Sequence, residues 1–177
     1  VICKVDIKFE EPIVIRNALS PELLDYSFKL WQDSALQFTD DTGQLRDRVS
    51  ASTVGHFIVS YWTQKEFQPI LDHLETQIDK HVPNPVFNDF RILKYSLHCF
   101  IPRHLDGTDT LRNNTHNVII QMSDTDNYKG GKVIVNDTEY KLEPGDALIY
   151  DFKVLHEVRP IKQGLRYVMN LRFHSTV

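Results

Sequence analysis

The sequence predicts an α+β protein that is mainly β: a double-stranded β-helix, or jelly roll, with two N-terminal helices packed on one sheet. From Phe90 onward, short β-prone runs are separated by turn signals at intervals of roughly eight to twelve residues, which is the pattern of a β-sandwich or barrel. Before that point, two stretches repeat apolar residues at helical spacing. A chain of 177 residues that is 41% hydrophobic can bury one sizeable core. We therefore expect one domain over 1–177, in which 1–89 supports a β core over 90–174.

The N-terminal half is expected to contain strands and two helices. Residues 3–16 alternate charged and apolar positions, which predicts one or two strands. Residues 20–22 (Ser-Pro-Glu) form a helix start with a hydroxyl cap and a proline at the first helical position, and this helix should end near Ser34. A β-prone run over 57–62 precedes a second helix, which begins at 63–66 and is stopped by two prolines. The apolar face of the second helix should pack on a sheet.

Eight strands are expected in the second half. The runs cover 90–98, 100–105, 115–122, 131–135, 138–142, 146–150, 154–159 and 165–173. Asn136-Asp137 supplies the turn between the fourth and fifth runs, and Pro144-Gly145 supplies the next turn. Eight short strands fit a jelly roll of two sheets. Longer loops over 107–115 and 123–130 should lie at the open end and border the substrate.

Composition excludes several functional classes. A net charge of −4 with mixed signs gives no basic surface, which argues against a nucleic-acid-binding protein that works by neutralising phosphates. Two cysteines form neither a disulfide framework nor a Cys-x-x-Cys pair, which favours a reducing compartment. No signal-peptide core and no apolar run of membrane-spanning length is present. We therefore expect a cytoplasmic protein with no membrane partner.

Two histidines and one aspartate are the candidate metal ligands. On a strand, residues i and i+2 project to one face, so His104 and Asp106 can bind a single ion. His73 and Glu75 have the same spacing but lie in a helical pattern, where their side chains would point about 200° apart. His156 completes a set that leaves three coordination positions open, which is typical of non-haem Fe(II). The alternative interpretations are a charged strand end for His104 and Asp106, and a core histidine for His156.

Two arginines on the last predicted strand need partners. Arg166 begins an otherwise apolar run, and burying a guanidinium is costly unless an anion meets it. Because the planar donors of arginine match a carboxylate, a dicarboxylate cosubstrate would explain Arg166, and pairing with an internal acid is the rival explanation. Because alternate residues of a strand point to the same face, Val168, Asn170 and Arg172 should share the face of Arg166, and Arg172 should also point inward.

The order of these motifs resembles the prolyl-hydroxylase branch of the Fe(II)/2-oxoglutarate-dependent dioxygenases. The resemblance covers roughly residues 90–174. The residues that carry it are His104-Leu105-Asp106, Gly130-Gly131-Lys132-Val133, the stretch from Glu143 to Tyr150, His156-Glu157-Val158 and Gly164-Leu165-Arg166-Tyr167.

The resemblance implies a complete set of site residues and cofactors. His104, Asp106 and His156 would bind Fe(II), and Arg166 would bind the far carboxylate of 2-oxoglutarate. Tyr95 would add a hydroxyl to the same carboxylate. The reaction would consume O2, with ascorbate in support, and would hydroxylate a C–H bond, with a prolyl residue in a peptide or protein as the substrate.

Two features leave alternatives open. Arg172 stands where similar prolyl hydroxylases often carry an aromatic residue. It could pair with Asp106 or the near carboxylate of the cosubstrate, as the six-residue arginine spacing of the nucleic-acid-demethylating dioxygenases suggests, or it could hold an acidic group of the substrate. Residues 37–53 form a polar run too long for a plain connection, and they are either a segment that closes over the substrate, as in the similar family, or a solvated loop.

Alternative functions also remain. The chain could hydroxylate a free amino acid or another small molecule, or it could be a non-enzymatic jelly-roll binding module. A metal-dependent enzyme of the cupin type that uses no 2-oxoglutarate would carry a His-x-His motif, which this sequence lacks.

Overall fold

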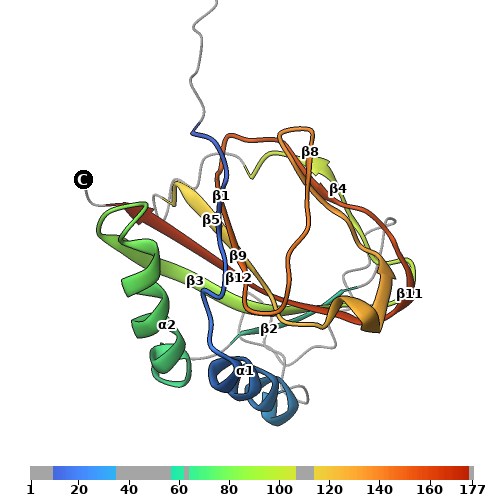
Figure 1. Ribbon diagram of the computed structural model, residues 1–177, viewed down its shortest axis with the longest axis horizontal. Helices are drawn as coiled ribbons and strands as arrows, with labels where there is room; N and C mark the ends of the chain where they lie inside the picture. The colour runs from blue at the N-terminus through green and yellow to red at the C-terminus, as the bar shows by residue number, and fades with distance from the viewer. Residues whose placement is uncertain (1–9, 35–56, 62–63, 107–113, 176–177) are drawn as a thin grey trace, which may run out of the picture.

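A computed structural model describes residues 10–34, 57–61, 64–106 and 114–175 of the chain. Two helices cover one face of a six-stranded antiparallel sheet, and a four-stranded antiparallel sheet packs on the other face (Figure 1). The expectation of a mainly β protein with two N-terminal helices is confirmed. The predicted segment 37–53, Cys3 and most of the loop 107–115 lie outside the described residues.

The sheets combine strands that are distant in the sequence. The six-stranded sheet has the order β1 (Ile13–Ile15), β9 (Ala147–Asp151), β5 (His116–Gln121), β12 (Arg166–Ser175), β3 (Pro85–Tyr95) and β2 (Phe57–Tyr61). The four-stranded sheet has the order β4 (Ile101–His104), β10 (His156–Val158), β7 (Val133–Val135) and β8 (Thr138–Tyr140). A two-stranded sheet pairs β11 (Ile161–Gly164) with β6 (Tyr128–Gly130), next to the short 3-10 helix Thr125–Asn127.

Both helices begin where the sequence predicts. Helix α1 spans Pro21–Ser34, and the Ser20 hydroxyl caps it by accepting a hydrogen bond of 3.3 Å from the Leu23 amide. Helix α2 spans Gln64–Ile78 and therefore ends several residues before the prolines that were expected to stop it. Neither helix is long and apolar enough to cross a membrane, as judged over the described residues.

The side chains on the two faces of the six-stranded sheet pack into two separate hydrophobic cores. Along β12, Met169, Leu171 and Phe173 pack with the helices, whereas Val168 packs with the four-stranded sheet. Successive side chains of a strand point to opposite faces, so this alternation sends every second residue of β12 into the space between the sheets. The candidate site residues predicted from the sequence line that space.

Several boundaries of the strands differ from those that the sequence predicts. Strand β3 begins at Pro85, five residues before the predicted start, so the β core extends into the segment assigned to N-terminal support. The predicted loop 123–130 contains strand β6, which pairs with β11. Both strands are short and rich in lysine, glutamine and glycine, and such residues give no strand signal.

The two predicted turns have the expected backbone geometry. Asn136 and Asp137 have φ values of 50° and 62°, and they connect β7 to β8 as a two-residue hairpin with both central residues in the left-handed region. Gly145 has a φ of 91°, and a Cβ at this position would lie 2.6 Å from the Leu19 carbonyl oxygen. Only glycine fits there without displacing the backbone.

Asp146 joins the N-terminal segment to the β core. Its carboxylate accepts hydrogen bonds from the Asn17 amide (3.0 Å), the Glu143 amide (2.9 Å) and Arg16 Nη1 (2.6 Å). Burial raises the pKa of Asp146, but these hydrogen bonds and the Arg16 charge outweigh burial, so the pKa lies below its usual value. The carboxylate therefore stabilises the fold above its unfolded-state pKa, and this contribution is lost as the pH falls through the folded-state pKa.

Replacing Asp146 with alanine should lower the free energy of unfolding by about 2–4 kcal/mol, because two backbone amides and an arginine lose their acceptor. Urea denaturation at neutral pH measures the change. Glu139→Ala is the control, since the Glu139 carboxylate pairs with Lys132 at the protein surface and should contribute no more than about 1 kcal/mol. Equal stabilities for the two variants would contradict this role of Asp146.

Candidate metal centre

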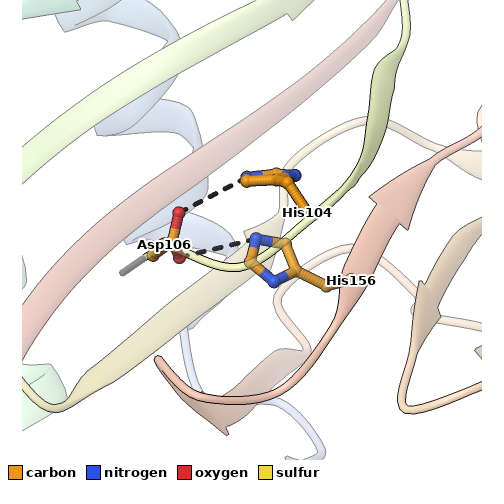
Figure 2. A group of neighbouring side chains, drawn as sticks. All are labelled: His104, Asp106 and His156. Carbon is orange, nitrogen blue, oxygen red and sulfur yellow. Dashed lines mark ion pairs between the residues drawn. The ribbon is translucent and has the colours of Figure 1, made fainter. Parts of the chain in front are cut away.

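The fold brings the three candidate metal ligands together. His104 is the last residue of β4, His156 is the first residue of β10, and the register places them directly opposite each other. Asp106 follows β4 by two residues. One potential ligand atom from each side chain lies within 4.8 Å of the other two, and Figure 2 shows the carboxylate facing both imidazoles. Each Nε2 lies 3.4 Å from an Asp106 oxygen.

Backbone hydrogen bonds orient both imidazoles. The Nδ1 atom of His104 lies 2.7 Å from the Pro102 carbonyl oxygen, and the Nδ1 atom of His156 lies 3.0 Å from the Val154 carbonyl oxygen. A carbonyl oxygen can only accept, so Nδ1 carries the proton in both rings. Nε2 is therefore the ring atom turned toward Asp106 in both histidines, and it is the atom that could bind a metal ion shared with that carboxylate.

The environment keeps Asp106 ionised. Burial raises the pKa of this carboxyl, but the hydrogen bond with His104, the charges of His156 and Arg172, and a hydrogen bond from Asn117 together lower it to about 2. The hydrogen bond with Asp106 raises the pKa of His104, and burial lowers the pKa of His156. The aspartate is therefore available as an anionic ligand at any physiological pH.

Arg166 lies buried at one end of the same cavity, with 1% of its surface exposed. Its guanidinium lies 5.5 Å from the ring centre of Tyr95, the residue paired with it across the sheet. The Nε atom donates to Gln121 Oε1 at 3.1 Å, and the Nη1 atom has no hydrogen-bond partner among the described residues. No acidic side chain in the described part of the chain forms an ion pair with Arg166, so the rival explanation by an internal acid finds no support there.

Arg172 points inward, as the period-two count predicts. It lines the cavity, and its Nη2 atom lies 3.7 Å from Asp106 Oδ1. Asn117, directly opposite Arg172 on β5, donates a hydrogen bond to the other oxygen of Asp106. The six-stranded sheet thus contributes two groups that contact the carboxylate of the candidate metal ligand Asp106.

Several cavity residues were missed by the sequence analysis. Arg91, Asn117 and Tyr150 line the cavity, and Asp89 and Gln121 contact its two arginines, Arg172 and Arg166. Asn117 and Gln121 could have been found, since each is a polar residue inside an apolar run at an inward position of a strand. Asp89 and Arg91 give no such signal, because they occur in a mixed stretch that also fits an exposed strand.

A set of two histidines and one aspartate, with a buried arginine in the same cavity that forms no ion pair among the described residues, gives a site suited to non-haem Fe(II) and an anionic cosubstrate. The comparisons with known proteins agree with this class. No family model matches the chain. The chain is 28% identical over 174 residues to a PKHD-type hydroxylase of Acinetobacter baumannii (strain SDF). The aligned region covers 86% of this chain and 73% of the relative. It is 42% identical over 59 residues to a PKHD-type hydroxylase of Delftia acidovorans, and this aligned region covers 31% of this chain and 26% of the relative.

Solved structures share the fold over nearly the whole chain. A viral collagen prolyl hydroxylase from Paramecium bursaria Chlorella virus-1 has a TM-score of 0.65 at 13% identity, covering 95% of this chain and 97% of that one. A prolyl-4-hydroxylase from Pseudomonas putida has a TM-score of 0.65 at 14% identity, covering 94% and 93%. The resemblance to the prolyl hydroxylase-like branch of the 2-oxoglutarate- and Fe(II)-dependent oxygenases is therefore confirmed. Several of the relatives are matched over only 22–49% of their own length.

Replacing His104, Asp106 or His156 with alanine should weaken Mn(II) or Fe(II) binding by more than about a hundredfold, because two remaining ligands hold an ion poorly and even outer residues contribute ten- to a hundredfold. Anaerobic titration measures the affinity, and circular dichroism checks the fold. His73→Ala is the control, since His73 lies on α2 outside the cluster. Wild-type affinity in any folded ligand variant would disprove the assignment of that ligand.

Asn117→Ala should weaken metal binding by roughly ten- to a hundredfold, the range for residues that orient a metal ligand. The cause is the lost hydrogen bond to Asp106, which leaves that carboxylate free to rotate toward Arg172. The same titration applies. Asn170→Ala, on the neighbouring strand and without contact to Asp106, should change metal affinity less, and the reverse order would contradict the proposed orientation of Asp106 by Asn117.

Proposed function

We propose that the protein is an Fe(II)- and 2-oxoglutarate-dependent oxygenase that hydroxylates a C–H bond, with a prolyl residue in a peptide or protein as substrate. The observation that carries the proposal is the presence, in one cavity, of a two-histidine, one-aspartate set and a buried arginine with an unpaired Nη1 atom. Relatives named hydroxylases and similar structures named prolyl hydroxylases support it.

The donor set fits Fe(II). Two neutral imidazoles and one carboxylate match the preferred ligands of this ion and leave three coordination positions free. His104 and His156 would bind through Nε2, because Nδ1 is committed to a backbone carbonyl in both. Asn117 and Arg172 would fix the orientation of Asp106 as it binds.

The deep end of the cavity fits the far carboxylate of 2-oxoglutarate. Arg166 offers an unpaired donor in a buried site where a charge-assisted hydrogen bond is strong. Burial raises the pKa of Tyr95, so its phenol stays protonated beside that carboxylate. Leu93 and Val168 are paired on the adjacent strands β3 and β12, and both line the cavity. They would contact the methylene groups of 2-oxoglutarate.

When bound, Fe(II) and 2-oxoglutarate activate O2, so that one oxygen atom enters succinate as CO2 is lost and the other becomes the hydroxyl group of the product. The protein contributes position and exclusion of water. Arg166 and Tyr95 hold the cosubstrate at one end, and the apolar walls at Leu93, Ile119 and Val168 keep water from the reacting groups. These residues fix the direction from which a substrate can approach.

We infer that the two facing sheets form a double-stranded β-helix and that 1–177 is one domain. The antiparallel sheets with a shared core between them, and the similarity of fold over 93–95% of the chain, support this. A peptide substrate is supported by a similar prolyl hydroxylase from Trichoplax adhaerens that was solved with a peptide fragment of hypoxia inducible factor, with a TM-score of 0.61 at 15% identity, covering 93% of this chain and 83% of that one.

The decisive experiment incubates the protein with Fe(II), 2-oxoglutarate, O2 and ascorbate and measures succinate. Proline-containing peptides, free amino acids and a metabolite extract are then analysed by mass spectrometry for the gain of one oxygen atom. A non-enzymatic binding module would give no succinate under any condition.

Arg166→Ala should weaken 2-oxoglutarate binding roughly ten- to a hundredfold, because a charge-assisted pair contributes about 1.5–3 kcal/mol. Metal binding should change little, since Arg166 is remote from the ligand set. Calorimetric titration of the metal-free protein with Mn(II) measures metal binding, and titration of the Mn(II)-loaded protein with 2-oxoglutarate measures cosubstrate binding. Lys162→Ala is the control, because Lys162 is exposed on the nearby strand β11. If Lys162→Ala weakened the binding of 2-oxoglutarate and Arg166→Ala did not, the assignment of Arg166 as the anchor of the cosubstrate would be wrong.

A further inference from the structure

The cavity wall beside the candidate metal centre carries charged groups that the proposed chemistry leaves unused. Asp89 and Arg91 lie on β3, and the register pairs Arg172 with Asp89 and Asn170 with Arg91. These residues occupy alternate positions of adjacent strands and therefore project to the same face. Arg91, Asn170 and Arg172 line the same cavity as the metal ligands.

One carboxylate faces two guanidinium groups in this cluster. Asp89 Oδ2 lies 3.7 Å from Arg172 Nη1 and 4.0 Å from Arg91 Nη1, and both distances exceed that of a hydrogen bond. The Arg91 Nε atom donates to the neutral amide oxygen of Asn170 at 2.9 Å. The Arg172 Nε atom is buried and has no hydrogen-bond partner among the described residues. Since arginine keeps its proton in proteins, the cluster has one positive charge in excess.

The other acids that line the cavity in the described part of the chain do not supply the missing negative charge. Asp106 lies 3.7 Å from Arg172, but a metal ion bound to Asp106 would neutralise the negative charge of this carboxylate. Glu157 lines the cavity and pairs with Arg159 at 3.2 Å. The Phe152 ring, 5.6 Å from the Arg172 guanidinium, offsets the charge only in part. With 18% of Arg91 and 26% of Arg172 exposed, both side chains can be reached from outside.

We propose that Arg91 and Arg172 bind a carboxylate of the primary substrate, so that the enzyme acts on a molecule with an acidic group close to the hydroxylated carbon. The inference rests on the proposed function, since it treats Asp106 as a metal ligand and Arg166 as the cosubstrate anchor. Arg166 and Arg172 are six residues apart on a strand that rises roughly 3.3 Å per residue, so the cavity has two separate cationic ends. One end takes the cosubstrate, and the other takes the substrate.

Arg91 gives the cleaner test of the two arginines. Arg172 also lies beside Asp106, so its replacement would disturb the metal centre. In the described part of the chain, the Arg91 side chain hydrogen-bonds Asn170 and faces Asp89, and it forms no hydrogen bond or ion pair with a proposed metal ligand. Arg91→Gln removes the charge, Arg91→Lys keeps it, and Arg103→Gln removes a charge from an exposed pair with Asp137. The last variant is the matched control.

The probes are pairs of small molecules that differ only in charge. One set pairs N-acetylated amino acids with their amides, which tests an α-carboxylate. The other pairs N-acetyl-aspartate amide with N-acetyl-asparagine amide, and the glutamate with the glutamine derivative, which tests a side-chain carboxylate. Calorimetry measures their binding to the protein loaded with Mn(II) and 2-oxoglutarate under nitrogen, where no turnover occurs.

In the wild-type protein, the tightest-binding carboxylate should bind at least about tenfold more tightly than its amide, as expected for one charge-assisted contact. Arg91→Gln should reduce this ratio to about twofold or less, and Arg91→Lys should keep part of it. Arg103→Gln should match the wild type. If the preference for the carboxylate over the amide appears in the first set of probes, the site binds an α-carboxylate. If it appears in the second set, the site binds a side-chain carboxylate.

The result that would overturn the inference is a protein that binds Mn(II) and 2-oxoglutarate yet binds no carboxylate more tightly than its amide. A preference that survives unchanged in Arg91→Gln would equally overturn it. Both outcomes leave the proposed function standing. A wild-type protein that binds neither the metal nor 2-oxoglutarate would instead refute the proposed function, and the inference with it.

Discussion

The carboxylate of Asp106 sets the requirement that the rest of the cavity satisfies. A largely buried negative charge is stable only if neighbouring groups replace the water that it has lost. Here the two imidazoles approach from the four-stranded sheet, and Asn117 and Arg172 approach from the six-stranded sheet. Neither sheet alone could stabilise the charge. The aspartate therefore links the two layers at the point where the proposed chemistry occurs.

The helices contribute to this arrangement indirectly. They cover the outer face of the six-stranded sheet with a large apolar core, which fixes the position of β3, β5 and β12. Because the outer faces of these strands are held by packing, their inner faces can carry a high density of polar and charged groups. Stability is supplied on one side of the sheet, and chemistry is placed on the other.

Much of the fold and of the candidate site could be predicted from local sequence patterns. The spacing of His104 and Asp106, the inward count from Arg166 to Arg172 and the turns at Asn136 and Gly145 all depend on short-range geometry, and the structure agrees with them. What could not be predicted depends on pairing between distant segments. The partners of Arg172 on β3 and β5 follow from strand order, and no local pattern specifies that order.

The early start of β3 has the same cause. Residues 85–89 include Pro85, Asn88 and Asp89, which are depleted in strands, and the segment is held in the sheet by pairing with the end of β12. This extension brings Asp89 opposite Arg172, so neither the start of the strand nor the charge that it contributes could be predicted from the local pattern.

The alternation along β12 limits how this protein can diversify. Even-numbered residues from Arg166 to Arg172 face the cavity, and odd-numbered residues from Met169 to Phe173 face the helices. A single inserted or deleted residue within this strand would exchange the two sets and ruin the site and the core in one step. Single substitutions at even positions change the chemistry and leave the odd positions intact. New specificities can therefore arise by replacing side chains within the strand, while changes of length are confined to the loops.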